Sequence, residues 1–194
     1  MVVAHPDAPV RSLLDTIAEP ASHPVPDLPA IGGALLELAA DTAYLDGWIR
    51  RLGATSGALR IHAPAHGPRL MLAHRLEGQM GAVHDHRVWV ALAAVTGLET
   101  HRHYRRPASP QEPPTLAEAT ELAPRDVVTL LPPDDIHDHG HVTGRGAPAY
   151  CLILTGDDQR RFERNEWDLA TGRRRLLRPG DGGRWVASEP MQPA

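Results

Sequence analysis

The sequence predicts an all-β protein, an antiparallel sandwich or barrel, preceded by short helices. Five short apolar segments follow Gly57, namely ALRIHA, RLMLAHRL, RVWVALAAV, DVVTLL and AYCLILT, and they are separated by glycine, proline and charged residues, which is typical of strands. Because no long helical segment lies between them, an antiparallel arrangement fits better than alternating strands and helices. The 19 prolines of the chain also disfavour long helices.

Helical patterning is confined to the first part of the chain. Residues 11–19 predict one short helix, and the proline-rich stretch EPASHPVPDLP after it predicts a loop. From Ile31 to Leu52 apolar residues recur at roughly helical spacing and stop near Gly53, which predicts one or two amphipathic helices packed on the rest of the protein.

These patterns divide the chain into three parts. We expect a helical segment at 1–56, a barrel at 57–180 and an irregular tail at 181–194. Within the barrel, the proline-rich stretch from Pro107 to Pro124 reads as an exposed loop or hairpin excursion.

The bulk composition limits the classes of function. The length of 194 residues suits one domain, and a net charge of only -4 gives no electrostatic footprint for nucleic acid or an anionic membrane. A small-molecule substrate is therefore expected, with the protein a monomer or a homodimer. The single Cys151 excludes an intramolecular disulfide and a multi-cysteine metal site, so we predict a reducing, cytoplasmic location. No leader pattern or long apolar run contradicts a soluble protein.

Two clusters of histidines carry the strongest chemical signal. His84 and His86 stand two apart in GQMGAVHDHRVWVALAAV, where a strand is expected to begin. The period-two spacing of a strand directs both rings to one face and Asp85 to the other. Since neutral imidazoles are good ligands for borderline metals, this segment predicts half of a metal site.

The second cluster supplies the remaining ligand. LPPDDIHDHGHV places His137, His139 and His141 at alternate positions after a proline-marked turn. One of these rings would complete a set of three ligands that leaves open positions on a metal, with His101 and His103 of the HRH sequence as a rival source. An HxH pair alone is a weak signal, but two alternating clusters at strand edges favour a metal site. We expect His101, His103 and His139 to be structural or to support ligands.

At this point the chain resembles the cysteine dioxygenase-like branch of the cupin superfamily, whose fold is a double-stranded β-helix. The resemblance spans roughly 59–177 and rests on HDHRVW, GLETHRHYRR, LAPRDVVTLLPPDDIHDHGH and ERNEWDLAT in that order. It implies that His84, His86 and His137 bind iron(II), although three imidazoles also accept zinc, nickel or cobalt. The usual cupin glutamate has no counterpart in RVWV, and Glu99 lies too far along the chain to replace it.

The resemblance also implies how a substrate is held. Family members use an arginine on an early strand for the substrate carboxylate, which a guanidinium fork matches well. Arg60 in LRIH is nearest to that position, and a small shift of alignment would give the role to Arg69 or Arg75. Trp89, which we expect in the core, is the second candidate for the substrate-binding wall.

The chain departs from the family on a late strand. Thiol dioxygenases carry a Ser-x-His-x-Tyr set there, and the matching positions are Tyr150, Leu152 and Leu154. The cysteine that forms a crosslink with that tyrosine is also missing, since Ala91 stands near its place. Tyr150 and Tyr104 are the remaining candidates for a catalytic hydroxyl.

These observations predict a mononuclear non-heme iron oxygenase that oxidises a small thiol or amino-acid-like metabolite with dioxygen; a thiol would yield a sulfinate. One alternative is a metal-dependent cupin that acts on a chelating metabolite without a thiol. Another is a metal-binding or ligand-binding cupin without turnover. Cys151 lies in an apolar strand and is expected to be a buried small hydrophobe.

Overall fold

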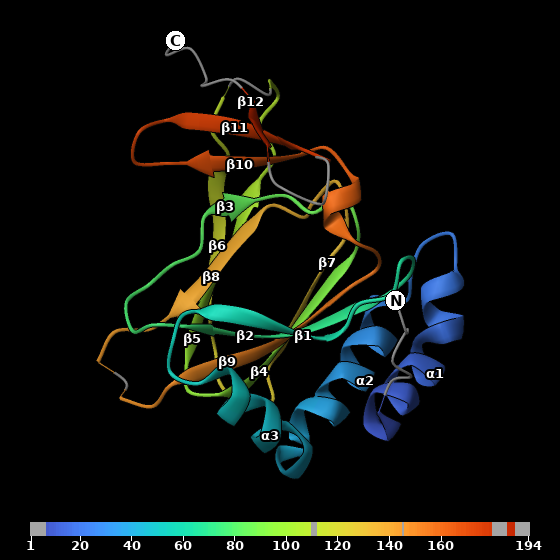
Figure 1. The fold of residues 1–194 in the computed structure, drawn as a ribbon. Coiled ribbons are helices and arrows are strands. Elements are labelled where there is room, and N and C mark those ends of the chain that lie inside the picture. The colour runs from blue at the N-terminus through green and yellow to red at the C-terminus, as the bar shows by residue number, and fades with distance from the viewer. Residues whose placement is uncertain (1–6, 110–111, 145, 180–185, 189–194) are drawn as a thin grey trace.

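In the computed structural model two antiparallel sheets face one another, and three helices cover the outer side of one of them (Figure 1). The structure describes residues 7–109, 112–144, 146–179 and 186–188. The helices are α1 (Ala8–Ser22), α2 (Leu28–Ala40) and α3 (Thr42–Leu52). The strands are β1 (Gly57–His62), β2 (Arg69–Arg75), β3 (Val83–His84), β4 (Val90–Thr96), β5 (Glu99–Arg105), β6 (Thr115–Leu122), β7 (Val127–Leu130), β8 (His137–His141), β9 (Ala149–Thr155), β10 (Arg164–Asp168), β11 (Arg173–Arg178) and β12 (Val186–Ser188), with a 3-10 turn η1 (Gln159–Arg161).

The strand pairing is that of a double-stranded β-helix. One sheet has the order β1-β2-β9-β4-β7 and the other β12-β11-β10-β3-β8-β5-β6. The pairs β2–β9, β3–β8, β4–β7 and β5–β6 are antiparallel and nested one inside the next, and they alternate between the two sheets. This pattern is a long hairpin rolled into a barrel, the jelly-roll form of antiparallel structure. The fold that the resemblance implied is therefore confirmed.

The predicted N-terminal helices are present, but the three of them make the chain a mixed structure and not an all-β one. The region from Ile31 to Leu52 forms two helices, which part at Asp41, and the side chain of Asp41 accepts the backbone N–H of Tyr44 at the start of α3. The helix predicted at 11–19 extends to Ser22 and includes Pro20. None of the helices in the described part of the chain is long and apolar enough to cross a membrane.

The main core lies between the helices and the first sheet. It joins buried residues of α1 and α2 to one face of β2, β4 and β9, and it includes Leu35, Leu72 and Leu154. The opposite face of the same strands packs toward the interior of the barrel, where Leu92 and Ala94 belong to a smaller cluster. Burial on both faces explains the uninterrupted apolar run of RVWVALAAV.

The five apolar segments form β1, β2, β4, β7 and β9 as predicted, whereas polar strands escaped prediction. The stretch from Pro107 to Pro124 contains β6, which pairs with β5 along its length, so of the two expectations the hairpin fits and the loop does not. Strand β6 is exposed at every position but the last, so it carries no apolar alternation. Most of the tail predicted at 181–194 lies outside the described residues, and Val186–Ser188 forms β12.

Candidate metal centre

Three histidines converge at one end of the barrel interior. One ring nitrogen each of His84, His86 and His137 lies within 4.8 Å of the others. His84 of β3 stands opposite His137 of β8 in the sheet, and the Nε2 atoms of His86 and His137 are 2.7 Å apart. The set predicted from the two histidine clusters is thus brought together as a possible metal triad.

A buried carboxylate, not strand geometry, positions His86. Strand β3 ends at His84, and the chain turns at Arg87, which has a left-handed φ of 65°. Asp135, from the PPDDI segment, accepts the backbone N–H groups of His86 (2.8 Å) and Arg87 (2.9 Å) through Oδ2. The expected period-two strand therefore covers only the first ligand, and a hydrogen-bonded turn directs the second.

Asp85 and Asp135 form a buried acidic pair beneath this turn. Both have no exposed surface, and Arg106 links them, at 3.1 Å to Asp85 and 2.5 Å to Asp135. Asp85 also accepts the backbone N–H and the side-chain amide of Asn165. Sequence reasoning missed these supporting residues, although each lies in a segment that carries the resemblance: HDHRVW, HYRR, PPDDI and ERNEW.

Strand β8 is buried at every position, which explains its unusual HDHGH sequence. Its three histidines point into the barrel, and Asp138 on the outer face pairs with Arg102 of β5. Gly140 lies under the segment at 77–80, where a Cβ atom would collide with the carbonyl oxygen of Gln79. Only glycine fits this close approach.

Hydrogen bonds orient two of the three rings toward the shared point. Nδ1 of His84 lies 2.8 Å from the carbonyl oxygen of Ala82, so it donates and leaves Nε2 as the lone-pair atom. Nδ1 of His137 lies 2.8 Å from Nε2 of His101. His101 is therefore placed to orient the ring of His137, in the manner of residues that orient metal-bound imidazoles.

The environment keeps the rings neutral, as metal ligands must be. Burial, reinforced by the positive charge of Arg164, lowers the pKa of His84 to about 3. Burial and the neighbouring imidazoles hold the pKa values of His86 and His137 well below the usual 6.5. Burial also lowers the pKa of His101 to about 4, with His139 as the second cause. The donor set therefore fits a borderline divalent metal without any deprotonation at neutral pH.

These shifts predict a loss of stability in acid for the metal-free protein. The four rings bind protons at about pH 6.5 in the unfolded chain but resist them in the folded one, so stability falls as the pH drops below 6.5. Each such ring contributes up to about 1.4 kcal/mol between pH 7.5 and 5.5. Urea unfolding is expected to give a free energy of unfolding that is roughly 3–5 kcal/mol lower at pH 5.5 than at pH 7.5. An equal or higher value at pH 5.5 would contradict neutral buried rings.

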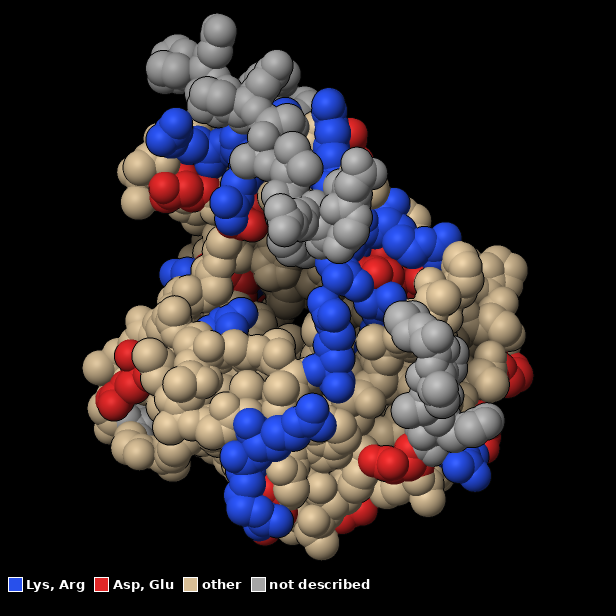
Figure 2. Space-filling model, viewed as in Figure 1, with Lys and Arg blue, Asp and Glu red and all other residues tan. Residues whose placement is uncertain are grey.

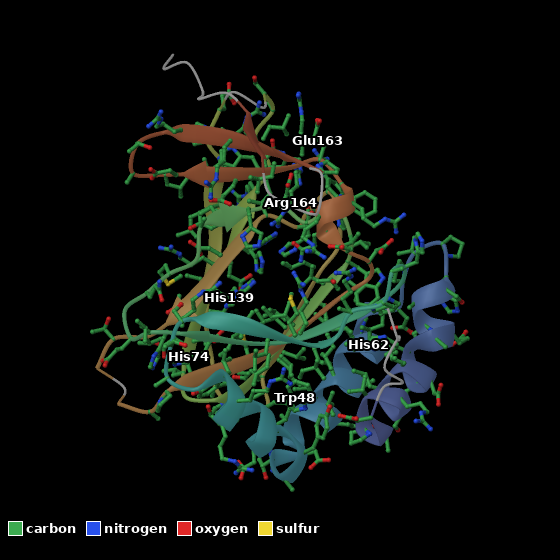
Figure 3. The ribbon with its side chains drawn as sticks, viewed as in Figure 1. Trp48, His62, His74, His139, Glu163 and Arg164 are labelled. Atoms are coloured by element: carbon green, nitrogen blue, oxygen red, sulfur yellow. The ribbon has the colours of Figure 1, made fainter. Side chains whose placement is uncertain are left out.

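A cavity of about 260 Å³ opens onto the triad. Figure 2 shows this face of the molecule hollowed, with basic side chains around the opening. The cavity is lined by Ala58, Met71, Ala73, Arg75, Gly81, Ala82, His84, His86, His137, His139, Ile153, Gln159, Arg164 and Glu166. Figure 3 shows Arg164 and His139 in the space between the sheets, while His74 and Trp48 lie toward the helices. The candidate metal ligands thus share one chamber with two guanidinium groups.

Of the early arginines, Arg75 lines this chamber and Arg60 does not. Arg60 is exposed and borders an adjoining cavity, where Arg69 pairs with Asp158 at 2.9 Å. Trp89, the other predicted substrate-binding residue, is buried in the core between the helices and the sheet. Of the three arginines considered from the sequence, Arg75 is the one that lines the cavity of the triad.

The two predicted catalytic tyrosines are not brought to the cavity. Tyr104 lies on the outer face of its sheet among Val83, Ile136 and Trp167, and its hydroxyl donates to Asp138 at 3.4 Å. The hydroxyl of Tyr150 donates to the carbonyl oxygen of Gly53, on the helix side of the other sheet. Neither tyrosine lines the chamber.

The register of β9 explains why Tyr150 points away. Tyr150, Leu152 and Leu154 all pack into the core beside the helices, and Ala91 stands opposite Leu154 in that layer. The inward positions of β9 are one residue out of step with them, and Ile153 is the one that lines the cavity. The Ser-x-His-x-Tyr set is absent at these positions too.

A larger cavity of about 780 Å³ lies on the other side of His101, where β5 and β6 approach β7. His101 and His103 line it, but none of the three triad histidines does. His103 faces this cavity, with Nε2 3.2 Å from the carbonyl oxygen of Asp134. His103 therefore belongs to the barrel edge and not to the metal centre.

No protein-family model and no curated protein matches the chain. Solved structures with a partial likeness include a protein with a double-stranded β-helix domain from Klebsiella pneumoniae (14% identity, 59% of this chain, 83% of that one, TM-score 0.43). They also include an RmlC-like cupin from Methanocaldococcus jannaschii (11%, 58% and 90%, 0.43) and a cupin superfamily protein from Desulfitobacterium hafniense (13%, 54% and 79%, 0.40). The fold assignment rests on the strand pairing described above.

Proposed function

We propose that this protein is a metal-dependent cupin enzyme, a mononuclear non-heme iron oxygenase that oxidises a small thiol or amino-acid-like carboxylate with dioxygen. The observation that carries the proposal is the chamber itself, in which neutral His84, His86 and His137 and the guanidinium of Arg75 line one cavity. When bound by the three histidines, an iron(II) ion supplies open coordination positions for a substrate and dioxygen.

The remaining residues of the chamber would bind and orient the substrate. Arg75 offers a planar fork to a carboxylate, and no ion pair of its guanidinium is found within the described residues. Met71 and Ile153 provide an apolar wall that limits water. Arg164 donates to Gln159 at 2.7 Å, which fixes the polar side of the opening.

One observation favours a different substrate for the same centre. Among the described residues, no serine, threonine or tyrosine lines the chamber, so no side-chain hydroxyl is placed to manage a proton or bound oxygen. A chelating metabolite that carries its own ionisable groups would not need one. The second candidate is therefore a metal-dependent cupin acting on a chelating substrate without a thiol.

Oxygen uptake by anaerobically iron-loaded protein tests the proposal. The panel is cysteine, 3-mercaptopropionate, cysteamine and, for the second candidate, small hydroxy and keto acids. We expect uptake with at least one substrate, loss of uptake in His137→Ala, and no change in the matched control His66→Ala, an exposed histidine on a turn. Uptake with acids alone supports the second candidate, and no uptake by metal-replete protein leaves a cupin without turnover.

Replacing Arg75 with glutamine tests the substrate-binding role. A charge-assisted hydrogen bond contributes about 1.5–3 kcal/mol, so KM for a carboxylate substrate is expected to rise roughly 10- to 150-fold with a smaller change in kcat. Steady-state kinetics on the substrate identified above provide the measurement. The control is Arg60→Gln, which lies outside the chamber and should leave KM unchanged. The reverse pattern would return the role to Arg60.

A further inference from the structure

A second cluster of metal-binding side chains lies deeper in the barrel than the triad. It consists of Glu99 of β5, His139 of β8 and Cys151 of β9, and one ligand atom of each lies within 4.8 Å of the others. The exposed fractions of the three residues are 0%, 3% and 0%. Three strands that are far apart in the sequence thus bring together a carboxylate, an imidazole and the only cysteine of the chain.

We propose that Glu99, His139 and Cys151 form a second metal site, selective for a divalent ion of the zinc type. A thiolate with an imidazole is a donor set that suits zinc or cobalt and disfavours calcium and magnesium, which require oxygen ligands. The site differs from the triad, whose three imidazoles contain no sulfur or oxygen donor.

Charge balance supports an ion at this depth. Burial and the neighbouring Glu99 raise the pKa of the Cys151 thiol well above its usual value, so an ion would bind with release of the thiol proton to solvent. The carboxylate and the resulting thiolate would then neutralise a divalent ion, and the complex would carry no net charge. An unpaired charge there would be very costly. The triad has three neutral ligands and would keep the charge of its ion, which suits a centre that opens onto a polar cavity.

The contact between His139 and Glu99 does not account for both oxygens of the buried carboxylate. Nδ1 of His139 lies 3.1 Å from Oε2 of Glu99, so this oxygen has a hydrogen-bond partner. The other oxygen, Oε1, is fully buried and has no hydrogen-bond partner of ordinary geometry among the described residues, although the Cys151 thiol interacts with the same carboxylate. A buried carboxylate oxygen left without such a partner is rare, and an ion bound beside it would supply one.

His141 provides an independent observation at the same place. It stands directly opposite Glu99 in the β5–β8 register and is 5% exposed. Neither of its ring nitrogens has a hydrogen-bond partner among the described residues. Directly opposite side chains on one sheet face are neighbours, so His141 lies beside Glu99, although it is not among the residues whose ligand atoms lie within 4.8 Å of one another.

The two sites would lie side by side without sharing a ligand. His139 lines the chamber of the triad, and this offers an ion a route to the buried cluster. The rings of His137 and His139 are stacked, with 5.8 Å between centroids. An ion held by Glu99, His139 and Cys151 would tie β5, β8 and β9 together and fix the wall of the chamber.

Anaerobic titration of the full metal-free protein with cobalt(II) tests this inference. Metal analysis after gel filtration gives the stoichiometry, and absorption reports sulfur ligation through the thiolate-to-cobalt charge-transfer band in the near ultraviolet. We expect two cobalt ions per chain and a band that only Cys151 can produce. One ion without the band, or two without it, would overturn the second site.

Two variants separate this site from the triad. Cys151→Ala is expected to retain one cobalt and lose the band, whereas His84→Ala is expected to retain one cobalt and keep the band. A band that persists in a wild-type protein with a single cobalt would support the second site while contradicting the triad and the proposed function. Glu99→Gln, which preserves side-chain shape, should weaken the band; circular dichroism identifies any variant that fails to fold.

Discussion

Replacing His86 with alanine is expected to weaken metal binding by more than about 100-fold, the upper range for loss of a residue that only orients a ligand. The ring provides one of three nitrogens at the shared point, and its Nε2 lies 2.7 Å from that of His137. Competition with a chromogenic chelator measures the affinity of the triad. Cys151→Ala serves as the background, so that the second cluster cannot retain an ion.

Thermal unfolding gives a second readout of the same change. A ligand present at 100 times its Kd stabilises a protein by about 2.7 kcal/mol, which corresponds to roughly 5–10 °C in a chain of this size. The Cys151→Ala protein should gain this increment when iron(II) or zinc is added, and the same protein with His86→Ala should not. Exposed His66 again provides the matched control, because His66→Ala should gain the full increment. Equal gains in all three proteins would rule out the triad as the metal site.

Replacing Asp135 with alanine is expected to destabilise the protein by about 3–5 kcal/mol, the range for removing one partner of a buried ion pair. The substitution removes the acceptor of two backbone N–H groups and leaves Arg106 facing Asp85 alone. Chemical denaturation measures the loss, and the melting temperature should fall by roughly 6–20 °C. Because Asp135 holds His86 in place, metal affinity should fall with it.

The neighbouring carboxylate supplies the control for this experiment. Asp134 is exposed, so Asp134→Ala should change the unfolding free energy by no more than about 0.5 kcal/mol. A double-mutant cycle with Arg106→Ala should give a coupling energy of at least about 1 kcal/mol. Additive effects of the two substitutions would show that the ion pair does not support the turn at His86.

A strand or helix could be predicted from the sequence only where its burial leaves a recognisable apolar pattern. The strands with apolar residues on both faces were visible in the sequence because burial imposes a continuous apolar run. Strand β6 was not, since both of its faces are exposed and neither period nor composition marks it. The helical region was detected, but its weight in the fold was underestimated, because patterning shows that a helix forms and not how much core it covers.

Some residues of the candidate site could likewise be recognised from the sequence, and others could not. The alternation of histidines marked the two clusters, and the family resemblance selected His137 within the second one. Arg60 and Arg75 lie on neighbouring strands, β1 and β2, and no pattern in the sequence shows which of the two lines the cavity of the triad. Tyr150 failed because a shift of one residue on β9 moves a side chain from the cavity to the helix-covered face.

The sequence by itself determined the apolar strands and the helical region before them, and its motifs indicated the double-stranded β-helix and three histidines as candidate metal ligands. These features depend on residue type and local spacing, which a linear chain displays directly. Only the tertiary structure decided which polar residues meet: Asp135 beneath His86, Arg75 beside the triad, and Glu99 with His139 and Cys151. Each of these contacts joins strands from distant parts of the chain, and such contacts depend on the register and closure of the barrel, which no local pattern specifies.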